Sequence, residues 1–169
     1  SPLYTTCFFS NFYLGGLRDI ESLQFGYDGL TAAGVTVIHD LATGIDRDAR
    51  TVTLAGGAVL SYDRLVLSPG IDFREDAVPG WSLDAAEVMP HAYKAGPQTV
   101  LLRQMVQAMP EGGLFVMVAP PNPYRCPPAP YERVCMIAHA LSQTNPTAKI
   151  MILDPIISGI VTVDDDREG

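Results

Sequence analysis

Basic residues are scarce in this sequence. It has 11 lysines and arginines against 19 aspartates and glutamates, so its formal net charge is −8 and its isoelectric point is about 4.6. A protein of this charge is a poor candidate for binding nucleic acid or anionic lipid through a basic surface. No hydrophobic run reaches the roughly 18 residues that a membrane-spanning helix needs. The sequence therefore predicts no nucleic-acid partner and no membrane span.

Cysteine is scarce as well. The three cysteines are Cys7, Cys126 and Cys135, and an odd, small number is not a disulfide framework. No CxxC pair is present, so a structural zinc site is not expected. Cys135 and His139 would share one face of a helix, but two ligands do not make a metal site. We predict that this pair packs in the core and that the chain has no metal site.

A glycine-rich turn is missing where a nucleotide-binding unit would have one. Residues 114–118 predict a short buried strand, and residues 128–142 predict a helix with an apolar face. Between them lie five prolines and one cysteine: Pro120, Pro121, Pro123, Pro127, Pro128 and Cys126. A glycine-rich turn lets backbone amides approach a pyrophosphate, whereas proline has no amide hydrogen to donate. This loop is therefore not expected to bind a nicotinamide nucleotide.

The residues that are present predict a folded α/β chain. The hydrophobic fraction of 47% is sufficient for a core. Strands at 114–118 and 149–154, joined by the 128–142 helix, predict a parallel β-α-β unit with Val116, Val118, Ile150 and Ile152 on adjacent strands. Gly56 and Gly57 predict the turn of a β-hairpin. Further elements are expected as helices over 18–33 and 97–109, strands over 35–41 and 65–67, a connector over 71–96 and one strand in the tail.

Seven motifs together resemble a known family. They are TCFFSN (6–11) followed by two glycines, GYDGL (26–30), VIHDLATGID (37–46), AGGAVLSYDRLVLSPGI (55–71), PHAYKAG (90–96), APPNPYRCPPAPYER (119–133) and KIMILD (149–154). In this order they resemble the flavoprotein subunit of flavocytochrome c sulfide dehydrogenase. That family belongs to the two-dinucleotide-domain flavoproteins, with the sulfide:quinone reductases and glutathione reductase-like enzymes. The resemblance covers about residues 3–154, and its most specific part is RCPP.PYER.

The resemblance implies a fold and a domain arrangement. The fold would be α/β, made of partial FAD/NAD(P)-binding, Rossmann-like domains of the glutathione reductase type. Residues 1–80 would be the remnant of an FAD-binding domain without its N-terminal GxGxxG unit, and residues 81–154 the start of a second Rossmann-like domain with the proline loop. Residues 155–169 are an unassigned tail. The family has sequence on both sides of the matched region, so we expect an interior fragment.

The resemblance also implies a flavin site. Cys7 matches the cysteine that holds FAD covalently in the family. Ala42 and Thr43 are candidates for contacts with the adenine, and Pro69 and Gly70 for contacts with the pyrophosphate or the ring; ordinary sheet and turn roles are an alternative for all four. Because the phosphate-binding turn is missing, we expect FAD to be covalently attached in the intact protein and absent or weakly bound in this chain alone.

Cys126 is the candidate catalytic residue. It lies just before a predicted helix, where the positive end of the helix dipole and neighbouring Arg125 favour a thiolate. The resemblance implies that this cysteine is one half of a redox-active disulfide beside the flavin, whose second cysteine is absent from this chain. The alternative is a structural proline-bounded loop. Tyr131, Glu132 and Arg133 are expected to cap and solvate the helix.

The expected function follows from the resemblance. It is a flavin-dependent sulfide:cytochrome c oxidoreductase in the periplasm, with sulfide as the substrate and a cytochrome c subunit as the partner; this chain alone would be inactive. The first alternative is a sulfide:quinone-type or polysulfide-linked flavoprotein. The second is a cofactor-free interaction fragment that keeps only the fold.

Overall fold

The computed structural model of the chain describes residues 1–155 and 160–162. These residues form two compact units, which are described separately below. The first unit contains Ser1–Tyr4 and Gln24–Asp72, and the second contains Thr5–Leu23 and the described residues from Phe73 onward. Among the described helices, none combines the length and the apolar character needed to cross a bilayer.

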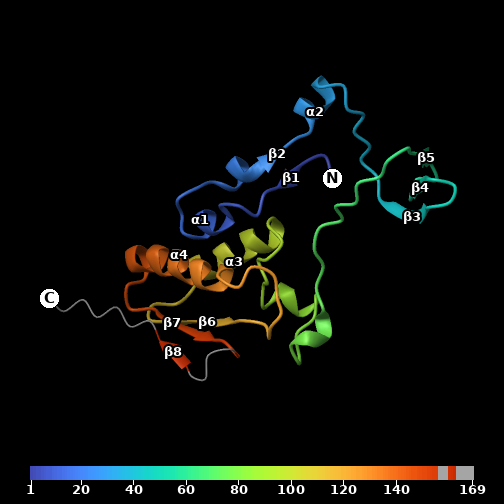
Figure 1. Cartoon of the computed structure of the whole chain (residues 1–169). Coiled ribbons are helices and arrows are strands. Elements are labelled where there is room, and N and C mark those ends of the chain that lie inside the picture. The colour runs from blue at the N-terminus through green and yellow to red at the C-terminus, as the bar shows by residue number, and fades with distance from the viewer. Residues whose placement is uncertain (156–159, 163–169) are drawn as a thin grey trace. The chain divides into compact units, whose positions relative to one another are not determined.

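A three-stranded sheet forms one layer of the second unit. Strands β6 (Leu114–Val118) and β7 (Lys149–Leu153) are parallel, with Val116 opposite Met151, and β8 (Ile160–Thr162) is antiparallel to β7. Figure 1 shows the chain leaving β6, crossing through α4 (Ala129–Thr144) and returning to β7. This arrangement confirms the predicted parallel β-α-β unit and the predicted strand in the tail.

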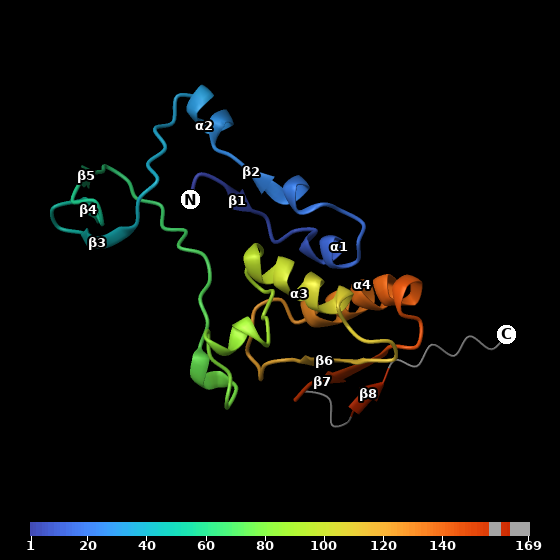
Figure 2. The same cartoon turned by 180° about the vertical axis from the view of Figure 1, so that it is seen from behind.

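Helices cover one face of this sheet. Both views show α3 (Pro97–Gln107) and α4 next to the strands, with α1 (Ser10–Leu14) packed on the outer side of these two helices (Figures 1 and 2). Pro97 opens α3, where its missing amide hydrogen has no helical partner in any case. Val134, Ile137 and Leu141 of α4 are almost fully buried against the sheet, as their helical spacing predicts. The core of this unit lies between these helices and the strands.

Helix α1 lies very close to α4. A side-chain carbon at Gly15 would stand 3.3 Å from both Cβ and the carbonyl oxygen of Met136. That separation is too short for a comfortable contact with backbone, so a side chain at position 15 would push the helices apart. Gly15, the first glycine after the TCFFSN motif, therefore allows this motif to pack against α4.

The two faces of the sheet differ in burial. Phe115, Met117, Ile150 and Ile152 point toward the helices and contribute to the core. Leu114, Val116 and Val118 point the other way and are 52%, 44% and 55% exposed within the described chain. The alternation follows from the two-residue repeat of a strand.

The first unit contains an antiparallel meander. Its strands are β3 (Ala42–Asp46), β4 (Thr51–Leu54) and β5 (Val59–Ser61). Gly57 has a φ of 88° in the β4–β5 turn, which confirms the predicted hairpin. Helix α2 (Asp28–Ala32) precedes the meander. Strands β1 (Tyr4–Thr5) and β2 (Gln24–Phe25) lie where the chain passes from one unit to the other.

Several expected elements are not formed. The single helix over 18–33 is replaced by a 3-10 turn at Ile20–Leu23, strand β2 and the short α2, because Gly26 and Gly29 weaken a continuous helix. Residues 35–41 and 65–67 form no strands, and Val66 is 87% exposed. Two further 3-10 turns, Glu75–Ala77 and Ala85–Glu87, lie in the expected connector. The domain boundaries at residues 80 and 154 stay a prediction.

The expectation for Cys135 and His139 is wrong. Both side chains are exposed on α4. The buried stripe of the helix passes through Val134, Ile137 and Leu141, and Cys135 is one residue, or about 100°, away from it. Within the described residues, no three His, Cys, Asp or Glu side chains come together as a metal site requires.

Candidate functional site

Cys126 lies at the junction between β6 and α4. Its side chain is exposed, and its carbonyl oxygen accepts a hydrogen bond from Ala129 N at 2.9 Å in the turn that opens the helix. Its backbone is left-handed, with a φ of 59°, which is uncommon for a residue other than glycine. Tyr124 donates a hydrogen bond to the carbonyl oxygen of Pro127 at 3.2 Å across this turn. The loop thus holds the sulfur at the surface, directly ahead of a 16-residue helix.

Arg133, one turn into α4, is buried and connects three segments of the unit. Its Nε donates to Asn11 Oδ1 at 3.2 Å, its Nη1 to the carbonyl oxygen of His91 at 3.1 Å, and its Nη2 to the carbonyl oxygen of Ala92 at 2.9 Å. Only 6% of the side chain is exposed. Burial lowers the pKa of this guanidinium from its ordinary value. Arg133 therefore fixes both α1 and the 91–93 loop to the start of α4.

The expectation that Tyr131, Glu132 and Arg133 cap and solvate the helix is wrong for Arg133, whereas Glu132 is exposed. Arg133 is buried, and Glu132 Oε2 accepts a hydrogen bond from Asn11 Nδ2. Tyr131 donates its hydroxyl to Asp154 Oδ2. The partners lie 121 and 23 residues away in the sequence, so no local spacing could have indicated them.

Asp154 is a residue that the sequence reasoning did not single out. It directly follows β7 and is 7% exposed. In a dinucleotide-binding β-α-β unit, an acidic residue after the second strand binds the ribose hydroxyls. Here its carboxylate instead accepts the hydroxyl of Tyr131, and this hydrogen bond raises the pKa of Tyr131 to about 12. The signal in the sequence was the aspartate at the end of KIMILD.

Cys7 lies in the turn that leads into α1. Its thiol is exposed, and its carbonyl oxygen accepts both the amide of Ser10 at 3.2 Å and the Ser10 hydroxyl at 2.8 Å. Phe8 and Phe9 beside it are 75% and 50% exposed. Asn11, in the same motif, provides the contacts to Glu132 and Arg133 described above. The two candidate cysteines thus belong to one compact unit, on segments that Arg133 joins.

The other four predicted cofactor contacts lie in the first unit. Ala42 and Thr43 are exposed at the start of β3, where the register with β4 shifts between Ala42 and Gly44. The hydroxyl of Thr43 donates to the carbonyl oxygen of Thr53 at 3.2 Å. Pro69 and Gly70 are exposed in a segment without regular structure, and Gly70 has a φ of 83°. Their assignment as flavin contacts stays a prediction.

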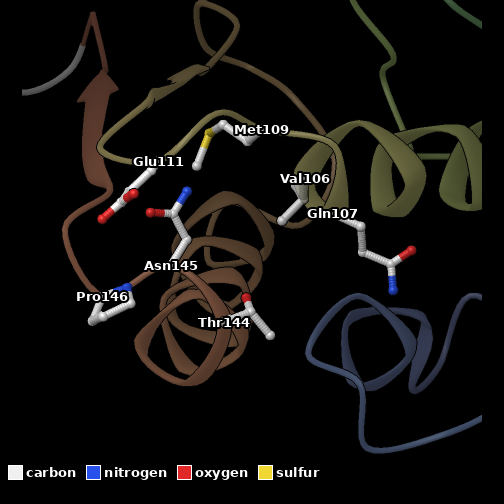
Figure 3. Close-up of a pocket in the computed structure, with 7 residues that line it drawn as sticks. All are labelled: Val106, Gln107, Met109, Glu111, Thr144, Asn145 and Pro146. Carbon is white, nitrogen blue, oxygen red and sulfur yellow. The ribbon is translucent and has the colours of Figure 1, made fainter.

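A small hollow of about 220 Å³ lies at the other end of α4 (Figure 3). It is formed between the ends of α3 and α4, beside Asn145. Asn145 already uses its carboxamide, donating to the carbonyl oxygen of Pro110 at 2.9 Å and accepting from Gly112 N at 3.1 Å. The 16 residues of α4 place this hollow about 24 Å from the Cys126 end. It is not part of the cysteine site.

Comparisons with known proteins give a family-model match over part of the chain, and a fold. Residues 99–161 match the family model described as the central part of the sulfide dehydrogenase [flavocytochrome c] flavoprotein chain. Two NADH dehydrogenase-like proteins from strains of Mycobacterium tuberculosis are 47% identical over 53 residues, which is 31% of this chain and 13% of theirs. The sulfide:quinone oxidoreductase of the hyperthermophilic bacterium Aquifex aeolicus superposes with a TM-score of 0.70 at 23% identity, over 91% of this chain and 35% of that chain.

These matches agree with the fold of the second unit and with the position of the Cys126 loop. The superposition confirms the expected Rossmann-like α/β fold. The family-model match contains β6, the proline loop with Cys126, the whole of α4, β7 and Asp154. The chain spans only a small part of the length of these relatives. The family-model match over residues 99–161 confirms the resemblance found in the sequence.

Proposed function

We propose that the intact protein is a flavin-dependent sulfide:cytochrome c oxidoreductase in which Cys126 reacts with sulfide. The observation that supports this most strongly is an exposed cysteine at the junction where a nucleotide-binding unit has its phosphate turn. The matching family is a flavoprotein chain of a flavocytochrome, which supports a cytochrome c partner. The periplasm is the compartment that we propose for this pair.

The reaction at Cys126 balances as a disulfide exchange. Hydrosulfide attacks the Cys126 sulfur of a disulfide that Cys126 forms with a second cysteine, outside this chain. A Cys126 persulfide forms and the second cysteine leaves as a thiolate with the electron pair. A second hydrosulfide takes the outer sulfur as a disulfide anion and leaves Cys126 as a thiolate. A bound flavin would accept the two electrons released when the two cysteine thiolates re-form their disulfide, and the cytochrome would be the acceptor beyond it. The exposed position of Cys126 gives sulfide access to its sulfur.

The Cys7 end of the unit fits a flavin ring. Its thiol is exposed, as covalent attachment requires, and the exposed side chains of Phe8 and Phe9 offer an apolar surface that a flat ring could cover. The pyrophosphate of FAD has no GxGxxG turn to bind it in this sequence. We therefore propose covalent FAD on Cys7 in the intact protein and weak or absent FAD binding by this chain alone.

A pyridine nucleotide is a poor alternative as the electron donor, even though two relatives are named NADH dehydrogenase-like. The prolines remove amide donors from the loop where the pyrophosphate would bind. Tyr131 also donates its hydroxyl to the carboxylate of Asp154, which lies in the position of a ribose-binding residue. Both features act against the same ligand at the same edge of the sheet.

Quinone is the specific alternative as the acceptor, because the superposed structure is a sulfide:quinone oxidoreductase. The deciding experiment uses the intact protein and compares sulfide with NADH as donors, and cytochrome c with a soluble quinone as acceptors. We expect sulfide to reduce cytochrome c and NADH to reduce neither acceptor. Reduction of quinone alone would favour the quinone-linked alternative, and no turnover with a correctly loaded flavin would favour an interaction role.

A further inference from the structure

Strand β6 forms one edge of its sheet. The order of the described strands is β6-β7-β8, so β7 covers only one side of β6. Lys149 N donates to the carbonyl oxygen of Gly113, and Ala119 N donates to that of Leu153, both at 2.9 Å. Alternate residues of a parallel strand face the same neighbour, so the odd-numbered residues of 113–119 direct their backbone groups toward β7. The even-numbered residues therefore direct theirs away from the sheet.

These outward-facing residues are Leu114, Val116 and Val118. Within the described residues, their amide hydrogens and carbonyl oxygens have no hydrogen-bond partner. Their side chains are the half-exposed ones on the face of the sheet opposite the helices. Edge strands in folded proteins are ordinarily protected by a charged side chain, a proline or a bulge, but the LFVMV sequence of β6 has no charge and no proline and pairs regularly with β7. This edge is therefore able to accept another strand.

Strand β6 is complementary to itself in the antiparallel direction. A two-fold axis through Val116 places this residue opposite Val116 of a second copy, and it places Leu114 opposite Val118. These are the residues whose backbone groups are free, so each pair can exchange two hydrogen bonds, about six in all. Pro120 has no amide hydrogen to donate, so the pairing ends just beyond the strand.

The charges around β6 favour the antiparallel direction as well. The net charge of −8 opposes self-association in general, but β6 itself brings no charged side chain to the seam. Glu111 precedes the strand and Arg125 follows it, so antiparallel pairing brings the acidic end of one copy toward the basic end of the other. Parallel pairing would align like charges. Lys149 lies at the Glu111 end, but it is one strand away from the seam.

We propose that this chain forms a two-fold dimer in which the two β6 strands pair antiparallel. The pairing joins two three-stranded sheets into one continuous sheet. A seam of five residues per copy is much smaller than the roughly 20–30 residues a side of a stable interface, so the dimer is weak and reversible. The inference does not rest on the proposed function.

The first test is Val116→Lys, measured by sedimentation velocity over a range of protein concentrations. We expect the mean mass of the unsubstituted chain to rise above 18.2 kDa as the concentration increases. Val116→Lys should weaken this association by about tenfold or more, because two like charges would face each other at the axis. Met105→Lys is the matched control, since it adds the same charge at an exposed apolar side chain on α3 and should still associate. A chain that is monomeric at every concentration, or a dimer that Val116→Lys does not weaken, would overturn the proposal.

Disulfide crosslinking tests the register and does not depend on the folding of the lysine variant. The three native cysteines, all exposed, are first replaced by serine. Val116→Cys would then face its own copy with the Cα atoms about 5.5 Å apart, a distance that a disulfide spans. Leu114→Cys would lie about 13 Å along the strand from its copy, so it should form far less crosslinked dimer. Equal crosslinking of Leu114→Cys would indicate parallel pairing or stacking of the two sheet faces, and it would overturn the proposed dimer.

Discussion

Replacing Arg133 with methionine should destabilise the second unit strongly. Arg133→Met keeps most of the volume of the side chain but removes three hydrogen bonds, to Asn11, His91 and Ala92, at 3.2, 3.1 and 2.9 Å. Each buried acceptor left without a donor costs about 1–3 kcal/mol. Removal of the buried cation offsets part of this cost, because its desolvation disappears. We expect a net loss of about 3–5 kcal/mol in the free energy of unfolding, comparable to breaking a buried ion pair.

The chain contains a convenient probe for this experiment. Trp81 is the only tryptophan, and its ring lies 5.4 Å from that of Phe73 and 6.5 Å from that of His91, in the unit that Arg133 holds together. Urea unfolding followed by tryptophan fluorescence therefore reports on the relevant part of the molecule. For a chain of this length the loss corresponds to a fall in Tm of roughly 6–20 °C.

Arg103→Met is the matched control. Arg103 is only partly buried, stacks on the ring of Tyr13 at 4.4 Å and makes one long hydrogen bond of 3.4 Å to the carbonyl oxygen of Arg18. Its replacement should cost about 1 kcal/mol or less. If Arg133→Met is no more destabilising than Arg103→Met, the three contacts of Arg133 do not hold the unit together and the reasoning fails.

Two further predictions concern pH and thiol reactivity. Burial, Lys94 and Arg133 lower the pKa of His91 from 6.5 to about 4. Between these two pH values the unfolded chain binds more protons than the folded chain, so acid favours unfolding. The contribution of His91 to the free energy of unfolding should be fully present above pH 6.5 and fall by about 1–2 kcal/mol toward pH 4, after allowance for the partial exposure of the ring. The fall should be smaller in His91→Asn, measured by urea unfolding at pH 5 and 7, and an equal slope in both proteins would contradict it. In differential alkylation of the three cysteines, read by mass spectrometry, Cys126 should react fastest at neutral pH, although all three thiols are exposed. Faster labelling of Cys135 would remove the argument for a sulfur site from this chain.

The second half of the fold could be predicted from the sequence because local patterns decide it. The apolar run of β6, the helical spacing of Val134, Ile137 and Leu141, and the short run of β7 all agree with the same β-α-β unit. The first half could not be predicted as well. Val35 and Val37 alternate as strand residues do and 65–67 is a short apolar run, but within the described residues neither segment is a member of any sheet.

The candidate site was predictable only where local sequence marks it. Cys126 could be found because its loop has an unusual composition at a recognisable junction. Arg133 could not, because its role depends on partners far along the chain: it reaches Asn11 across 122 residues. An arginine in the first turns of a helix is ordinarily solvated, and only tertiary contacts reveal that this one is buried.

The measurement that tests the central claim most directly is sulfide oxidation by the Cys126→Ser variant of the intact protein, with flavin content measured in the same sample. We predict that sulfide-dependent reduction of the acceptor is lost while the flavin content is unchanged, since serine cannot form the disulfide or the persulfide and Cys7 is untouched. Cys135→Ser, which changes an exposed thiol on the same helix, should keep full activity. Sulfide oxidation at an undiminished rate in Cys126→Ser would contradict the account.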